Sequence, residues 1–331
     1  MKNVIFIIDV DTGKHAGTGH LFRSLKIYKI LKETYKKKIK IYFLFKNLEK
    51  SNSIIRKYIK ENLIIFDNNF EKKISFLKKN DLIINDTPYE IEKNFKNYLL
   101  KKNFKNLVLI DHKKIKNDKN WIYINGIYSY KKNYPKNKRI YQGSKFVLLD
   151  KKFEKYNLKK RDNNVIISTG GTDTYNLNFK IFNKIKKLNF NKIYIVVGPG
   201  FSTNNPIFSI KDNRVKLLKN KDNLYKYFFK SNISIVTGGI TMFESIASLN
   251  YTFVYQSYAH QKYAINKMKK SGVVQLIGKL DRFYDRKLLM SLNKIFIGKK
   301  PYKFILKKRI IDGKALSRLK KILFYILDKS I

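Results

Sequence analysis

Short, continuously apolar runs alternate along the chain with segments in which apolar residues recur every three or four positions. Val4 to Ile8 is such a run, of strand length, and His20 to Leu31 follows it with apolar residues at helical spacing. Similar runs at 39–45, 63–66, 82–85 and 107–110 predict further buried strands. Continuous apolar strands separated by amphipathic helices are typical of a parallel sheet that is covered on both faces.

The same alternation occurs again in the second half of the chain. It weakens between about Asn125 and Leu158 and resumes at Val165. Strands are predicted at 165–169, 191–197, 213–218, 232–236, 251–255 and 272–277, with helices starting near 176, 222, 241 and 258. We therefore expect two α/β domains, residues 1–155 and 160–331. The closing helix, 314–329, is a candidate to pack back across the hinge between them.

The composition indicates a folded protein. Of the 331 residues, 44% are hydrophobic and 15% aromatic, which is enough apolar surface to offset the entropy cost of ordering the chain. The chain has no cysteine, which excludes disulfides, thiolate metal sites and cysteine nucleophiles. No apolar run reaches the roughly 18 residues that cross a bilayer, and the first residues resemble a strand more than a signal peptide. We expect a cytoplasmic location.

The net charge of +48 raises nucleic acid or an anionic membrane as a partner. The basic residues are 63 lysines and only 9 arginines, however, and the lysines occur on nearly every predicted helix and loop. Arginine is the usual choice for bidentate recognition of phosphate and guanine. We interpret the charge mainly as a bias of composition and expect no specific nucleic-acid partner. A lysine-rich protein that binds polyanions stays as an alternative.

The first candidate for chemistry lies between the first predicted strand and the helix after it. Gly17 and Gly19 lead into His20, and Arg23 follows one turn later. Glycines before a helix let the backbone approach an anionic ligand, which the free N–H groups of the helix start attract. An imidazole at that place can act as a general base near neutral pH. A helix-capping loop with a solvated histidine explains the same residues without a ligand.

Two glycine turns follow predicted strands of the second half, and both suit phosphate binding. The first contains Gly170, Gly171 and Asp173, and the second contains Gly239, Thr241 and Glu244. A carboxylate in the first turn of a helix can also accept hydrogen bonds from two vicinal hydroxyls. Without a ligand, the first turn is an ordinary strand-to-helix loop in which Asp173 or a threonine is the N-cap of the helix. Thr241 with Glu244 matches the capping-box pattern.

A fourth motif, Tyr258 to Gln261, opens the helix after the strand at 251–255. It is also explained as a polar helix start. The four motifs share one feature, because each follows the carboxyl end of a predicted strand. In open parallel sheets that edge is where ligands bind.

Taken in order, these motifs resemble the nucleotide-sugar hydrolases of pseudaminic acid synthesis and the related spore-coat polysaccharide proteins. The matching patterns are G-x-G-H-x-x-R at 17–23, G-G-T-D at 170–173, G-G-x-T-x-x-E at 238–244 and the glutamine at 261. Asp86 with Tyr89, and Asp111, resemble two further elements of that family. The resemblance implies a GT-B-like fold, with two Rossmann-like domains that face a central cleft.

The resemblance also implies roles for individual residues. His20 matches the catalytic histidine. The residues that match nucleotide contacts are Gly170, Gly171, Asp173, Gly239, Thr241 and Glu244. The residues that match substrate contacts are Asp11, Gly17, Gly19, Arg23, Tyr89 and Gln261. The resemblance implies neither a cofactor nor a metal ion.

The activity implied by the resemblance is hydrolysis of a UDP-linked diacetamido-trideoxy sugar, which releases UDP and free sugar for nonulosonic (pseudaminic) acid synthesis. His20 would activate water to attack the anomeric carbon. A glycosyltransferase that uses a UDP-sugar donor for surface polysaccharide is the alternative within enzymes. The hydrolase and the glycosyltransferase differ in whether His20 deprotonates water or an acceptor hydroxyl.

Overall fold

The computed structural model describes most of the chain. The described residues are 2–8, 19–45, 56, 59, 62–65, 70–87, 93–112, 121–127, 139–155, 162–173, 175–219, 221, 224–279, 285–299 and 309–328. They fall into two compact units. Unit 1 comprises residues 1–148 and 314–331, and unit 2 comprises residues 149–313.

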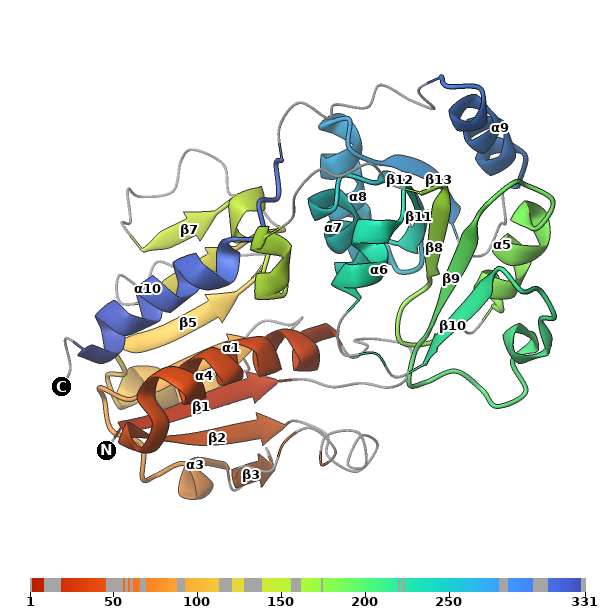
Figure 1. The fold of residues 1–331 in the computed structure, drawn as a ribbon. Helices are drawn as coiled ribbons and strands as arrows, with labels where there is room; N and C mark the ends of the chain where they lie inside the picture. The colour runs from red at the N-terminus through yellow and green to blue at the C-terminus, as the bar shows by residue number, and fades with distance from the viewer. Residues whose placement is uncertain are drawn as a thin grey trace. The chain divides into compact units, whose positions relative to one another are not determined.

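Unit 1 is built on a parallel sheet, in which seven strands are described (Figure 1). The strands are β1 (Lys2–Ile8), β2 (Ile39–Phe45), β3 (Asn62–Ile65), β4 (Leu82–Asp86), β5 (Asn106–Ile110), β6 (Ile122–Asn125) and β7 (Ile140–Gln142). Their order is β3-β2-β1-β4-β5-β6-β7. The helices described with them are α1 (Gly19–Tyr35), α3 (Phe70–Lys73), α4 (Lys93–Lys101) and α10 (Ala315–Asp328), with 3-10 turns at η1 (Lys36–Lys38) and η2 (Ser144–Phe146).

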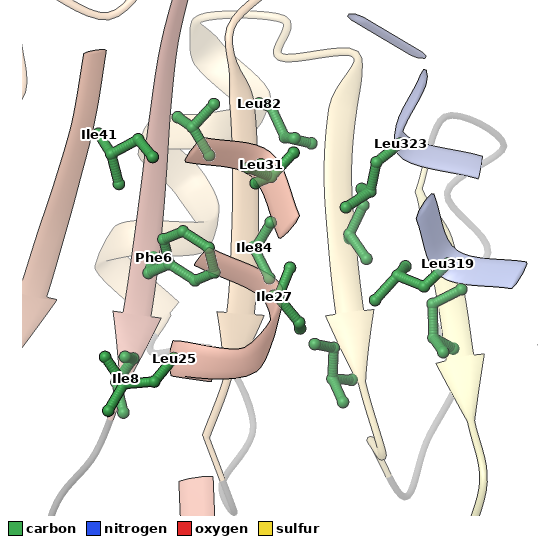
Figure 2. Packing of buried hydrophobic residues seen from close by; sticks show 14 of the residues in the cluster. Phe6, Ile8, Leu25, Ile27, Leu31, Ile41, Leu82, Ile84, Leu319 and Leu323 are labelled. Atoms are coloured by element: carbon green, nitrogen blue, oxygen red, sulfur yellow. The ribbon is translucent and has the colours of Figure 1, made fainter. Parts of the chain in front are cut away.

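Alternating strand residues bury the two faces of this sheet against different helices, because successive side chains point to opposite sides. One face packs Phe6 and Ile84 against Ile27 and Leu31 of α1 and Leu319 of α10 (Figure 2). The other face forms a second core, with Ile5, Ile83 and Tyr123 against Phe95 and Leu99 of α4. Full burial of one such side chain contributes about 1.5 to 3 kcal/mol, so both layers stabilise the sheet.

Unit 2 has the same architecture, with six parallel strands described in the order β10-β9-β8-β11-β12-β13. They are β8 (Asn164–Ser168), β9 (Lys192–Val197), β10 (Val215–Lys219), β11 (Ile233–Thr237), β12 (Tyr251–Gln256) and β13 (Gln275–Lys279). The helices are α5 (Leu177–Ile185), α6 (Tyr225–Lys230), α7 (Ile240–Ala247), α8 (Lys262–Lys270) and α9 (Asp285–Phe296), with 3-10 turns η3 (Lys151–Lys155), η4 (Pro206–Ser209) and η5 (Ala259–Gln261).

The last helix, α10, belongs to unit 1, whereas the sequence-based division assigns the whole of 160–331 to the second domain. Its apolar stripe explains this placement, because Leu316, Leu319 and Leu323 are buried in the core that α1 covers. The Lys2 ammonium also donates a hydrogen bond of 2.6 Å to the carbonyl of Leu327. The chain therefore returns to its first sheet after unit 2.

Strand order in both sheets reverses next to the first strand of the unit. In unit 1 the chain proceeds outward from β1 to β3 and then restarts at β4, on the other side of β1. In unit 2 the same reversal lies between β8 and β11. Ligands in open α/β sheets bind outside the carboxyl ends of the strands at such a reversal. A ligand site is therefore expected at the carboxyl ends of β1 and β4 in unit 1 and of β8 and β11 in unit 2.

Among the described residues, no helix is both long enough and apolar enough to span a membrane.

Candidate active site

The reversal point of the unit 1 sheet brings a histidine and a carboxylate together. His20 is the second residue of α1, and Asp86 is the last residue of β4. Nδ1 of His20 lies 2.7 Å from Oδ1 of Asp86. Asp86 is fully buried, while the His20 side chain keeps 19% of its surface exposed. The carboxylate of Asp86 thus lies inside the protein, while part of the His20 side chain is exposed.

The alternation along β4 explains why Asp86 meets α1. Leu82 and Ile84 point to the face of the sheet that α1 covers, and Asp86 follows them at the same period of two. On α1, the buried stripe that holds Ile27 continues toward the helix start through Arg23. Polar side chains thus replace apolar ones at the carboxyl edge of the sheet, where the hydrophobic layer ends.

The contacts of the imidazole fix its tautomer. Among the described residues, the polar partners given for the ring are at Nδ1, where Oδ1 of Asp86 lies at 2.7 Å and Nη2 of Arg23 at 3.3 Å. The carboxylate is the closer group and can only accept, so Nδ1 carries the proton and donates it to Asp86. Nε2 then holds the free lone pair. A ring in this state is prepared to accept a proton at Nε2.

Arg23 connects Asp86 to a second carboxylate. Its Nε donates to Oδ2 of Asp86 at 2.8 Å, and Nη2 donates to the other oxygen of the same carboxylate. Nη1 donates to Oδ2 of Asp111, which lies just after β5. Ser24 adds a further hydroxyl donor to Asp86 at 3.3 Å. Arg23 is only 8% exposed, and Nε, Nη1 and Nη2 of its guanidinium all donate to carboxylates of the protein.

Burial would by itself raise the pKa of the Asp86 carboxyl. The charge and hydrogen bonds of Arg23, followed by those of His20, outweigh this effect and hold the pKa of Asp86 well below its ordinary value. The same burial opposes the charge on Arg23, but Asp86 and Asp111 raise the pKa of its guanidinium further. Both members of this ion pair are therefore charged at neutral pH.

In unit 2, the loop after β8 is shaped by close backbone contacts. Gly170 has a φ of +105°, which favours glycine. The carbonyl of Gly171 accepts a hydrogen bond of 2.9 Å from the N–H of Gly200. A Cβ at Gly198 would lie 2.5 Å from that same carbonyl oxygen, so the loop after β9 needs glycine to come this close. Gly198 and Gly200 were not among the residues expected from the sequence, although the Gly-Pro-Gly run after the predicted strand 191–197 was a signal for them.

Asp173 has a clear structural task in the described structure. Its two carboxylate oxygens accept hydrogen bonds from the backbone N–H groups of Leu177 (2.7 Å) and Asn178 (3.1 Å) at the start of α5. Burial raises the pKa of this carboxyl, and the hydrogen bonds only partly offset the effect. The N-cap residue of α5 is Asn176, so Asp173 is not the N-cap itself, although its carboxylate binds the first two N–H groups of the helix.

The glycine turn after β11 starts α7 directly. Gly239 is the N-cap residue and provides no side-chain cap, so Thr241 and Glu244 lie inside the helix. The capping-box explanation is wrong here, since it needs Thr241 itself to precede the helix. Glu244 is 7% exposed. A Cβ at Gly238 would lie 2.5 Å from Ile265, whereas one at Gly239 would meet no described atom within 4 Å.

Gln261 and Gly19 are the other expected site residues that the structure describes. Oε1 of Gln261 accepts hydrogen bonds from the N–H groups of Ser257 (2.9 Å) and Tyr258 (3.3 Å), so it shapes the loop after β12. Gly19 is the exposed first residue of α1. The expected contacts Asp11, Gly17 and Tyr89 lie outside the described residues.

Two curated proteins are similar to this chain along most of its length. An uncharacterized protein of Methanocaldococcus jannaschii is 28% identical over 295 residues, which cover 81% of this chain and 59% of that protein. The chain thus spans less than two thirds of that relative. The spore coat polysaccharide biosynthesis protein SpsG of Bacillus subtilis is 25% identical over 276 residues, or 77% of this chain and 79% of SpsG. No protein-family profile matches the chain.

Solved structures share the fold over nearly the whole chain. MurG of Acinetobacter baumannii has a TM-score of 0.62 at 10% identity and covers 98% of this chain, with all of MurG matched. The calicheamicin glycosyltransferase CalG4 has a TM-score of 0.57 at 8% identity, with 99% and 98% of the two chains covered. A putative UDP-N-acetylglucosamine 2-epimerase of Listeria monocytogenes has a TM-score of 0.55 at 10% identity, with 99% and 98% covered. The expected fold class, two parallel-sheet α/β domains of GT-B type, is confirmed.

Proposed function

We propose that this protein hydrolyses a UDP-linked sugar, with His20 as general base. The observation that carries the proposal is the His20–Asp86 pair at the reversal point of the unit 1 sheet. A histidine with its Nδ1 proton held by a buried carboxylate, and with Nε2 directed away from that carboxylate, is the arrangement that accepts a proton in catalysis.

In the proposed reaction, the oxygen of water attacks the anomeric carbon of the sugar. The bond between that carbon and the phosphate oxygen breaks, and UDP leaves with the bonding electrons. The water proton moves to Nε2 of His20, and the positive charge that develops on the ring is stabilised by Asp86. The UDP-sugar and one water molecule are thus converted into free sugar and UDP, and His20 holds the proton that is released.

The glycine turns of unit 2 support a nucleoside diphosphate as the bound group. They follow β8 and β11, on either side of the strand-order reversal of that sheet. Backbone N–H groups at such turns stabilise phosphate charge, and the start of α7 adds its dipole. Following the resemblance, we assign Gly170, Gly171, Gly239 and Thr241 to the diphosphate and Glu244 to the ribose hydroxyls.

The substrate class rests on the relatives. SpsG is a spore coat polysaccharide biosynthesis protein, and the Listeria monocytogenes structure is that of a putative UDP-N-acetylglucosamine 2-epimerase. Together with the motif resemblance, these names favour a UDP-linked amino sugar. We propose the UDP-linked diacetamido-trideoxy sugar of nonulosonic (pseudaminic) acid synthesis as the first candidate. The structural likeness to CalG4, a glycosyltransferase, favours transfer to an acceptor as the second function.

If water is the acceptor, the purified protein is expected to release UDP from a UDP-linked diacetamido-trideoxy sugar with no other substrate present. The free sugar should appear in equal amount, which mass spectrometry and a coupled UDP assay together can measure. A panel of UDP-sugars, each with and without a lipid or sugar acceptor, completes the experiment. Release of UDP only when an acceptor is added would replace hydrolysis by transfer.

Replacing Glu244 by alanine is expected to weaken UDP binding by roughly tenfold or more, because a hydrogen bond to a carboxylate is worth about 1.5 to 3 kcal/mol. Calorimetric titration of UDP into both proteins measures the change. Glu154→Ala is the matched control, since it removes the same charge from η3 in the same unit. Equal UDP affinity in wild type and Glu244→Ala would remove Glu244 from the ribose site.

A further inference from the structure

Arg23 was expected to contact substrate, but its surroundings point to a different task. The guanidinium is buried, and Nε, Nη1 and Nη2 all donate to the carboxylates of Asp86 and Asp111. We infer that Arg23 is a positioning residue, which holds Asp86 and through it the His20 ring, and that Asp111 is the anchor of Arg23. This inference rests on the proposed role of His20 as general base.

The planar guanidinium suits this task because its N–H groups point in fixed directions. Nε and Nη2 donate side by side to the two oxygens of Asp86, a bidentate pair that fixes the plane of the carboxylate. Oδ1 of Asp86, which also faces Nδ1 of His20, is thereby held in one place. Arg23 thus determines the orientation of the group that orients the imidazole.

Asp111 is itself fixed on its other side. Its Oδ1 accepts hydrogen bonds from the N–H groups of Gly126 (2.8 Å) and Ile127 (3.0 Å), just after β6. Its own N–H donates to the carbonyl of Ile124, and its backbone has a φ of +52°, which is rare for a residue other than glycine. These contacts hold Asp111 turned back toward Arg23. A continuous chain of charged hydrogen bonds therefore joins His20 to the ends of β4, β5 and β6.

The charges explain what Arg23 adds beyond orientation. The cluster holds two carboxylates, and Arg23 is the described cation that contacts both of them. Without it, burial would favour the neutral form of Asp86. A protonated carboxyl can donate to Nδ1 instead of accepting from it, which would move the ring proton to Nε2 and remove the free lone pair. Arg23 thus keeps Asp86 an acceptor and His20 a proton acceptor at Nε2.

The first test measures the imidazole directly, without an activity assay. Nitrogen-15 labelling of the four histidines, with His20 assigned from the spectrum of His20→Asn, reports which ring nitrogen carries the proton. Wild type is expected to show the Nδ1–H tautomer at a pH where the ring is neutral. Arg23→Lys keeps the charge but loses the planar fork, and Asp111→Asn keeps an acceptor oxygen but loses the charge. Both variants are expected to show a mixture of tautomers.

The matched control is Asp81→Asn. Asp81 is also buried in unit 1 and also accepts backbone N–H groups, from Asn3 (2.9 Å) and Lys78 (2.8 Å), but it lies before β4 at the opposite edge of the sheet. Asp81→Asn is expected to lose stability and keep the wild-type His20 spectrum. If Arg23→Lys does not fold, Asp111→Asn decides the question. A wild-type His20 spectrum in folded Asp111→Asn and in every folded Arg23 variant would overturn the inference.

The second test is kinetic. Arg23→Lys and Asp111→Asn are expected to lower kcat by about 10- to 100-fold, as loss of the partners that orient metal-bound histidines does, with UDP affinity unchanged. A weaker affinity for the UDP-sugar with an unchanged kcat would instead identify Arg23 as a substrate contact. The two tests separate two failures. If wild type releases no UDP but the tautomer still changes in the variants, the proposed reaction is wrong and the positioning role of Arg23 stands.

Discussion

Replacing His20 by asparagine is expected to lower kcat for UDP release by about 10² to 10⁴-fold, the range that a general base contributes. The reason is that Nε2 is the ring atom left to accept the water proton once Nδ1 is committed to Asp86. UDP affinity should stay nearly the same, because the proposed nucleotide contacts belong to unit 2. Steady-state kinetics and UDP titration on the same preparations measure both quantities.

The comparison within unit 1 supplies the control for this change. Ser24→Ala removes a hydroxyl donor, 3.3 Å from Asp86, one residue beyond Arg23 on the same helix, and should have a far smaller effect on kcat. His20→Asn turning over at the wild-type rate would remove His20 from the reaction. A loss of UDP affinity as large as the loss of kcat would point to damage of the whole fold instead.

Asp86→Asn is expected to lower kcat by a similar factor, about 10² to 10⁴, although the carboxylate never touches the substrate in the proposed reaction. The asparagine amide can donate to Nδ1, which favours the tautomer with its proton on Nε2 and removes the base. In the Ser-His-Asp triad of proteases, the corresponding change costs about 10⁴-fold for this reason. The measurement is kcat of Asp86→Asn against wild type, with the Asp81→Asn variant as the matched buried control.

Asp86 is expected to stay ionised throughout the neutral pH range. The pKa of Asp86 is held below its ordinary value of 3.8, so the carboxylate stays charged in the folded protein at all pH values above that. The stability that it contributes is present above the unfolded pKa and is lost only as pH falls through the lower folded value. Asp86 should therefore add no ionisation of its own to the pH dependence of kcat between about pH 6 and 8, which the profile of His20→Asn, where the imidazole is absent, can measure. An ionisation that appears in that profile and is lost in the His20→Asn, Asp86→Asn double variant would contradict the assignment.

Much of the fold follows from the sequence because parallel strands that are buried on both faces are continuously apolar. The run at 39–45 became β2 with the same bounds, and the run at 107–110 lies within β5. Helix starts were predicted less closely. The start expected near 222 lies at Tyr225, while the one expected near 176 lies at Leu177, because turn residues before a helix do not specify which of them ends the loop.

The candidate site was partly visible in the same way. His20 could be proposed from its place between a predicted strand and a helix, and the glycines at 170 and 239 from the turns after two others. The pairing of His20 with Asp86 could not, since 66 residues separate them and only the neighbouring of β1 and β4 brings them together. The signal was present in Asp86 and Asp111, which each follow an apolar run as the His20 loop does.

The two parallel-sheet units, and the sheet edges at which polar side chains gather, could thus be predicted before the structure was known, because both depend on local apolar periodicity and on turn residues. Which polar groups face each other depends on how the strands and helices pack in three dimensions. This packing makes Arg23 a partner of two carboxylates, brings Asp173 to the first N–H groups of α5, and places α10 in the first unit. These contacts depend on which strands are neighbours in the sheet and on which face of the sheet each amphipathic helix covers. The spacing of residues along the chain specifies neither of these two features.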